Sequence, residues 1–550
     1  MADKDVFVVG VDVGTGSARA ALVSAASGHV RKVAVRATRT WTPQPEYFQQ
    51  STEDIWSAVC ATVKEVTQNV PAELVKGIGF DATCSLAVLD KNHLPVTVSP
   101  LGETEQNVIL WMDHRANSEA AHINSLKPDV LRYVGGTISP EMQTPKLLWL
   151  KKNLPQSWQT ACHFMDLPDF LTWKATGSYS RSLCSLVCKW TYKAGDKNKE
   201  GWDENYFKSI GLEDLLEDNY AKIGNDVLDP GTPVGKGLSD SAAKQLGLKP
   251  GTKVATSIID AHAGGVGLMG CNAEKINTDF TSRLALISGT STCHMVLSRD
   301  LHFVNGLWGP YWSAMVPNLW LTEGGQTCTG HLIDHIINTH PATPSVRSKL
   351  RPTEHIQQYL NGVLDRLAKQ KNLSNLSFLT KHLHMWPDFH GNRSPLADPT
   401  LLGMLSGLTL AKNEESLAVL YLTTIQALAY GTKHIITALV GGGITTIQSV
   451  LLCGGLSRNS LFVQVHADVL GLPVLCAREP ESVLLGSAVL AAYSAGIYSS
   501  VGEAMIAMGG YADVVTPNEQ VVESRFHDKK FEVFMKMFKD QREYRDIMES

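Results

Sequence analysis

A strand, a glycine-rich turn and a second strand are predicted near residue 12 and again near residue 289. Apolar, β-branched runs predict the strands, and the glycines predict the turns. The first unit comprises Val6–Val11, Asp12–Ser17 and Arg19–Val23, and the second comprises Ser282–Ile287, Gly289–Thr292 and Cys293–Val296. Because the same supersecondary unit occurs in both halves, we expect two similar domains rather than one core.

The segments between these units alternate between strand and helix patterns, which is typical of α/β architecture. Further strands are predicted at Val75–Phe80, Lys253–Ile259 and Ile447–Leu452, and helices at Ile55–Val66, Glu415–Leu439 and Ser460–Leu470. A chain of 550 residues is too long for one core. We expect an N-terminal domain over 1–265, a C-terminal domain over 266–500 and a helical extension over 501–550, ending in a charged, solvated helix at His527–Glu549.

The two glycine-rich turns have the composition of phosphate-binding turns. Glycines let backbone N–H groups approach a phosphate, and hydroxyl side chains add donors. An aspartate at the end of the first strand can hold Mg²⁺ through water. Each turn alone also fits an ordinary hairpin, but two equivalent turns suggest one phosphate chain held between domains. The residues are Asp12, Gly14, Thr15 and Gly16, and then Gly289, Thr290 and Ser291.

Two further segments place polar groups at predicted strand ends. Asp260 follows a strand and precedes glycines, where a carboxylate can accept a hydroxyl proton, although it could instead cap the next helix. The paired glycines Gly454 and Gly455 can lie against a planar base that Asn459 hydrogen-bonds. The alternative there is a plain strand-to-helix turn with Ser457 as its N-cap.

Other classes of site fit poorly. Gly265-x-Gly267-x-x-Gly270 matches a dinucleotide motif, but no sustained apolar helix follows it and no acidic residue stands at the required spacing. The chain has no GxxxxGK[ST] motif. A net charge of −5 argues against nucleic acid and anionic membranes as main partners. Ten scattered cysteines without a CxxC pair, and no signal-like or membrane-spanning segment, predict a reduced, cytoplasmic protein.

In this order the segments resemble the FGGY family of carbohydrate kinases, from about Val6 to Gly496. The resemblance includes Trp111–Ala116, Pro145–Leu150, Glu323–Gln326, Asp388–Pro395 and Glu481–Ala488. It is strongest to the ribulokinase-like branch, because of Cys188-Lys-Trp190, Asp260-Ala-His-Ala-Gly264 and Thr83-Cys-Ser-Leu86. The family implies two actin-like, ribonuclease H-like ATPase domains of the α/β class with an interdomain cleft that closes on substrate.

The resemblance also implies roles for individual residues. The sugar contacts would be Cys84 through its backbone, Ser85, Lys189, Asp260 and Glu323, with Asp260 as the general base. The ATP contacts would be both turns together with Gln326, Gly330, Gly454, Gly455 and Asn459. Asp12 would help to place Mg²⁺.

The implied activity is transfer of the γ-phosphoryl group of Mg·ATP to a hydroxyl of a small sugar, such as the ketopentose D-ribulose. The main alternative is a catalytically inactive regulator that binds sugar or nucleotide on the same fold. An actin-like chaperone or filament ATPase would have no use for Lys189 and Glu323, and a nicotinamide oxidoreductase would require NADH binding. The sequence leaves the oligomeric state open and is compatible with a homodimer.

Overall fold

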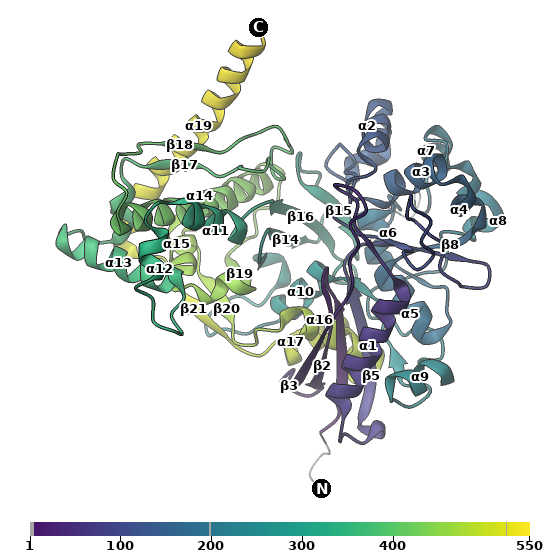
Figure 1. Cartoon of the computed structure of the whole chain (residues 1–550). Coiled ribbons are helices and arrows are strands. Elements are labelled where there is room, and N and C mark those ends of the chain that lie inside the picture. The colour runs from purple at the N-terminus through teal and green to yellow at the C-terminus, as the bar shows by residue number, and fades with distance from the viewer. Residues whose placement is uncertain (1–4, 197–199, 524) are drawn as a thin grey trace.

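The computed structural model describes residues 5–196, 200–523 and 525–550, so the first four residues lie outside it (Figure 1). Its first large sheet has the order β11-β5-β1-β2-β3, and β12 also pairs with β5. The strands are β1 (Phe7–Val13), β2 (Ser17–Ser24), β3 (Val30–Ala37), β5 (Val75–Ala82), β11 (Lys253–Val254) and β12 (Ile258–Ile259).

The position of β1 at the centre of this sheet explains its composition. It runs antiparallel to β2 and parallel to β5, and apart from its first residue the whole strand is buried. A strand with neighbours on both sides and both faces covered favours a continuous apolar run. The register places Asp12 beside Arg19 on β2 and beside Asp81 on β5. Three charged residues thus meet where β1 ends.

The second large sheet repeats this arrangement in the order β15-β16-β14-β13-β19-β20-β21. β13 pairs antiparallel with β14 and parallel with β19, as β1 does with β2 and β5. The predicted α/β class and the repeated hairpin are therefore confirmed. The strands are β13 (Arg283–Ser288), β14 (Thr292–Ser298), β15 (Trp308–Trp312), β16 (Trp320–Gln326), β19 (Ser449–Cys453), β20 (Val474–Ala477) and β21 (Ala512–Val515).

Helices α10 (Asp260–Met269) and α16 (Ser482–Ser494) lie together between the two sheets (Figure 1). α16 packs on β1 and β5, and α10 packs on β13 and β19. Their backbones touch: a Cβ on Gly267 would lie 2.0 Å from the carbonyl oxygen of Ser482, and one on Gly486 would lie 1.9 Å from that of Ala263. The glycines of the dinucleotide-like motif thus serve helix packing. The proposed boundary near residue 265 falls inside α10, and the division of the chain stays a prediction.

Two local predictions were wrong. The segment Lys253–Ile259 is two short strands, because the N–H of Thr256 leaves β5 and donates to the carbonyl of Thr232. The terminal helix α19 (Phe526–Glu549) is solvated only along part of its length, and its end projects from the body in Figure 1. Its first half is packed: the ring of Phe534 lies 4.4 Å from that of Trp386, and the Lys530 ammonium donates to two backbone carbonyls.

The remaining helices surround the sheets. In the first half they are α1 (Thr52–Thr67), α2 (Asn117–Leu126), α3 (Gln143–Asn153), α4 (Pro155–Thr160), α5 (Leu167–Thr176), α6 (Leu183–Lys189), α7 (Glu204–Ser209), α8 (Glu217–Tyr220) and α9 (Asp240–Leu246). In the second half they are α11 (Gly330–Thr339), α12 (Thr343–Arg347), α13 (Ile356–Gln370), α14 (Glu414–Gly441), α15 (Ser460–Leu470), α17 (Val501–Met508) and α18 (Glu519–Glu523). Within the described ranges, none is long and apolar enough to span a bilayer.

Three small sheets complete the structure. One has the order β4-β7-β6-β8 and two consist of paired short strands. Their strands are β4 (Gln49–Gln50), β6 (Leu86–Asp90), β7 (Val108–Ile109), β8 (Ala161–Asp166), β9 (Arg181–Ser182), β10 (Val227–Leu228), β17 (His384–Trp386) and β18 (Met404–Ser406).

Candidate active site

The first glycine-rich turn is closed by its own backbone and open on its outer side. The N–H of Gly14 donates to the carbonyl of Ser17 at 3.0 Å, and no atom lies within 4 Å of where a Cβ on Gly16 would stand. Arg19 donates to one oxygen of Asp12 through Nε at 2.8 Å and Nη2 at 2.5 Å, and its Nη1 contacts Glu481. The turn therefore offers free backbone beside a buried, ion-paired carboxylate.

The second turn is joined to the start of α11. The N–H of Gly289 donates to Ser291, and the N–H groups of Thr329 and Gly330 donate to Thr290 and Gly289. No atom lies within 4 Å of a Cβ built on Gly289, as at Gly16. Exposed backbone at a helix N-terminus is a favourable position for an anion.

A cavity of about 700 Å³ opens beside the second turn, a volume suited to a nucleotide-sized ligand. It brings together residues predicted from three separate segments, namely Gly289, Thr290, Gly330, Gly455 and Asn459. Gly454 lines a neighbouring cavity of about 500 Å³ that also contains Arg19 and Gly455. Ser291 and Gln326 line neither cavity, and the Gln326 amide donates to the carbonyl of Leu428 on α14.

Asn459 has a structural role that the sequence did not indicate. It is the N-cap of α15, where Ser457 had been the alternative, and its Oδ1 accepts from the N–H groups of Leu461 and Phe462. Its Nδ2 donates to Tyr421 at 2.7 Å and to Gln357 at 3.0 Å. A hydrogen bond from this amide to a base would have to replace one of those two.

The paired glycines should respond differently to alanine. Gly454 has φ +87° and a Cβ there would lie 2.1 Å from the carbonyl oxygen of Ser288, whereas Gly455 has no atom within 4 Å. We expect Gly454→Ala to lower the free energy of unfolding by about 2 kcal/mol or more. Gly455→Ala should unfold normally but raise KM for ATP about tenfold, equivalent to about 1.4 kcal/mol. Denaturant unfolding and ATP kinetics test both, and equal destabilisation by the two variants would contradict the prediction.

Asp260 is the first residue of α10, not its N-cap, which is Ile259. Its Oδ1 accepts from the N–H of Ala261 at 2.7 Å, and Oδ2 has no partner among the described residues. Burial, followed by the charge of Asp12, raises the pKa of Asp260 to about 6. The partly exposed carboxylate therefore keeps one oxygen available to a ligand and can exchange a proton near neutral pH.

Lys189 and Glu323 are buried, carry opposite charges and lie close to one another, and Lys189 also acts on Asp260. The Lys189 ammonium lies 4.7 Å from the ring centre of Trp308. Burial would lower the pKa of Lys189, but the nearby Cys84 and Glu323 raise it. Burial would likewise raise the pKa of Glu323, but His262 and Lys189 lower it to about 2. A buried cation thus lies near the candidate base, and a buried anion lies near that cation.

His262 connects Glu323 to a buried cysteine. Its Nε2 lies 3.4 Å from Oε2 of Glu323, and its Nδ1 lies 3.3 Å from Sγ of Cys184. Burial opposes a charge on this ring, but Cys184 and Glu323 outweigh it and raise the pKa of His262 to about 10. His262 therefore contacts the Glu323 carboxylate and stabilises its negative charge.

Cys84 and Ser85 follow the end of β5. The backbone carbonyl of Cys84 accepts from Gln143, and Ser85 is fully buried, with its Oγ within 3.0 Å of Thr83 Oγ1. The same Oγ accepts the N–H of Trp111 at 3.1 Å, and the Trp111 indole donates to Thr15 at 3.1 Å. Trp111 thus links the predicted sugar contacts to the first phosphate turn.

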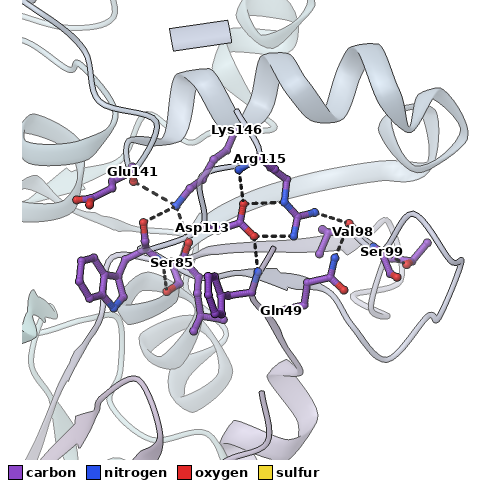
Figure 2. A network of polar contacts seen from close by, with 12 residues as sticks. Gln49, Ser85, Val98, Ser99, Asp113, Arg115, Glu141 and Lys146 are labelled. Atoms are coloured by element: carbon purple, nitrogen blue, oxygen red, sulfur yellow. Dashed lines mark hydrogen bonds and ion pairs between the residues drawn. The ribbon is translucent and has the colours of Figure 1, made fainter. Parts of the chain in front are cut away.

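Figure 2 shows what holds the loop after Trp111. Arg115 donates to both oxygens of Asp113, at 2.8 and 2.7 Å, and both side chains are fully buried. Asp113 also accepts the N–H of Phe48, and Arg115 donates to the carbonyl of Val98. The Lys146 ammonium donates to the carbonyls of Leu110 and Glu141. The family motif at Trp111–Ala116 is therefore a scaffold for the site.

Four residues near this site were missed by sequence reasoning. Asp81 stands level with Asp12, accepts a hydrogen bond from Ser487, and has a pKa raised by burial and by Asp12. Its position at a strand end, like that of Asp12, was a usable signal. Three further residues lie close to Lys189 and Glu323. The ring of Trp308 contacts both Lys189 and Arg393. The charge of Glu141 interacts with Lys189, and that of Arg393 interacts with Glu323. Only the tertiary structure brings these three together.

Comparisons with known proteins show the family of this chain. Residues 7–267 match the model of the FGGY family of carbohydrate kinases, N-terminal domain, and residues 284–495 match that of the C-terminal domain. The chain is 52% identical over 553 residues to the FGGY carbohydrate kinase domain-containing protein of Homo sapiens, covering 98% of each. It is 40% identical over 513 residues to a D-ribulokinase of Saccharomyces cerevisiae, covering 88% of this chain and 71% of the relative.

The solved structures give the same fold. The crystal structure of xylulose kinase from Rhodospirillum rubrum aligns with a TM-score of 0.78 at 19% identity, covering 98% of this chain and 99% of that one. At this identity the likeness concerns the fold alone. It confirms the predicted two-domain, actin-like α/β architecture.

Proposed function

Because the chain belongs to the FGGY family of carbohydrate kinases and is an ATP-dependent sugar kinase, we propose that its acceptor is a ketopentose, D-ribulose first. The observation that carries this proposal is one buried charged cluster that contains Lys189, Asp260 and Glu323. Within it, Oδ2 of Asp260 is free to accept a proton. The D-ribulokinase relative supports the choice of sugar.

The proposed chemistry follows from the charges of these groups. Asp260 accepts the proton of the attacking hydroxyl, because its raised pKa suits a base near neutral pH. Lys189 donates to a sugar oxygen, and Glu323 accepts from a sugar hydroxyl. The two glycine-rich turns hold the phosphates of ATP from opposite domains, which aligns the γ-phosphoryl group for transfer.

The residues around Asp12 fit a divalent cation that arrives with ATP. Arg19 contacts one oxygen of Asp12, and Oδ1 of the adjacent buried Asp81 has no hydrogen-bond partner among the described residues. Carboxylate and water oxygens are the ligands that Mg²⁺ prefers. We propose that Asp12 holds Mg²⁺ through water, and that the ion supplies neutralisation of phosphate charge.

An ADP-release assay tests the acceptor. The panel contains D-ribulose, L-ribulose, D-xylulose, ribitol, D-fructose and glycerol, each with Mg·ATP, and reactions without protein serve as the blank. We expect the highest kcat/KM with D-ribulose. A higher value with glycerol or a hexose would overturn the ketopentose assignment. A sugar that raises the melting temperature of the protein, with no turnover of any sugar, would instead favour the inactive regulator.

A further inference from the structure

Two cysteines and one histidine form a cluster next to Glu323 of the candidate sugar site. Cys184, Cys188 and His262 are all buried, and both cysteines are free thiols. Their ligand atoms all lie within 4.8 Å of one another. It is the one group of this kind among residues 5–196, 200–523 and 525–550, and the phosphoryl-transfer chemistry makes no use of its sulfur atoms.

The fold explains why these three side chains meet. Cys184 and Cys188 are four residues apart on α6, so they project from the same face of that helix. His262 lies in the first turn of α10, directly after β12, and α6 packs against β12. Three soft or borderline ligands therefore converge from two rigid elements, which is the arrangement that binding sites for metals require.

We propose that Cys184, Cys188 and His262 form a binding site for a thiolate-preferring divalent cation, with Zn²⁺ as the expected ion. Around tetrahedral Zn²⁺, a sulfur and a nitrogen ligand are about 3.6 Å apart, given the usual bond lengths. Sγ of Cys184 and Nδ1 of His262 are already 3.3 Å apart. Two thiolates and a neutral imidazole around Zn²⁺ carry no net charge, so the complex can be buried without an unpaired charge.

The environment of His262 points independently to a metal. Its Nε2 faces Oε2 of Glu323 at 3.4 Å, and neither atom has another hydrogen-bond partner among the described residues. Histidines that bind metals commonly direct the second ring nitrogen to a carboxylate, which orients the ring and selects the ligating nitrogen. Here that contact leaves Nδ1, the nitrogen facing Cys184, as the ligand.

The cluster is also connected to the candidate sugar site. Glu323 contacts His262, and Lys189 directly follows Cys188 in α6. A cation bound to Nδ1 of His262 would fix the ring whose Nε2 faces Glu323, and would thereby change the position of the Glu323 carboxylate. We therefore expect Zn²⁺ to raise KM for the sugar more than KM for ATP. This second expectation depends on the proposed function, whereas metal binding itself does not.

The test measures metal binding on the full chain, stripped of metal with a chelator and kept reduced. Zn²⁺ is titrated against a chromophoric chelator, and proton release is followed in weak buffer, because binding must deprotonate the ligands. We expect one Zn²⁺ per chain with Kd at or below the micromolar range. Cys188→Ser and His262→Asn should each weaken binding at least a hundredfold, and Glu323→Gln by about 10–100-fold.

Cys271→Ser is the matched control, because Cys271 is equally buried but follows the other end of α10. It should bind Zn²⁺ like the parent chain. Thermal melting of each variant verifies that it is folded. If Cys188→Ser does not fold, His262→Asn still tests the site. Absence of stoichiometric binding, or binding that survives both substitutions, overturns the site. An unchanged sugar KM at full occupancy overturns only the link to the sugar site.

Discussion

Replacing Asp260 with asparagine should lower kcat by about 10²–10⁴-fold and leave the melting temperature unchanged. Asparagine keeps the shape of the side chain and the oxygen that accepts from Ala261. Because Ile259 is the N-cap of α10, no capping interaction is lost. What disappears is the basicity, so the loss should appear in kcat, while KM for the sugar changes less.

The pH dependence of kcat is a second test of the role of Asp260. Burial raises the pKa of Asp260 to about 6, and only the deprotonated carboxylate can accept a proton. The turnover number should therefore fall as the pH decreases through about 6, and this acidic limb should be absent from the residual activity of Asp260→Asn.

Asp203→Asn is the matched control for this substitution. Asp203 is the N-cap of α7 and accepts from the N–H of Tyr206, which asparagine also does well. Its kcat should equal that of the parent chain. If Asp260→Asn keeps kcat within a fewfold of the parent, Asp260 is not the base and another carboxylate must be sought.

Replacing Asp113 with alanine should produce the largest loss of stability, about 3–5 kcal/mol in the free energy of unfolding. The substitution leaves the fully buried Arg115 guanidinium without its bidentate partner. It also removes the acceptor of the Phe48 N–H. The guanidinium would keep only its hydrogen bond to the carbonyl of Val98, and the Phe48 N–H would have lost its acceptor. Denaturant unfolding monitored by fluorescence measures the loss.

Two comparisons separate this effect from a general sensitivity to charge removal. Arg478 also donates two hydrogen bonds to Asp513, both to one oxygen, but both side chains are 66% exposed, so Asp513→Ala should unfold almost like the parent. The double variant Asp113→Ala with Arg115→Met should lose less stability than the sum of the single variants, because no buried charge is left unpaired. An additive double variant would show that the pair is not what stabilises this loop.

Much of the local structure could be predicted because it depends on short-range patterns. Helix α15 begins at Ser460 and ends at Leu470 as its period predicts, and β1 lies within two residues of its predicted bounds. The two glycine-rich turns also form where expected, because glycine composition and flanking strands are local signals. These patterns, together with the ordered family motifs, were sufficient for the class of protein and for its kinase activity.

The tertiary structure alone decided which side chains meet. The Asn459 amide nitrogen is occupied by Gln357 and Tyr421, and Thr256 leaves its strand to bond with Thr232, so both depend on partners far away in the chain. The contact between Cys184 and His262, 78 residues apart, exists because α10 packs between two sheets and α6 packs on the preceding strand. Such contacts follow from the packing of whole elements against one another, and side-chain periodicity within a segment carries no information about which distant segment will cover it.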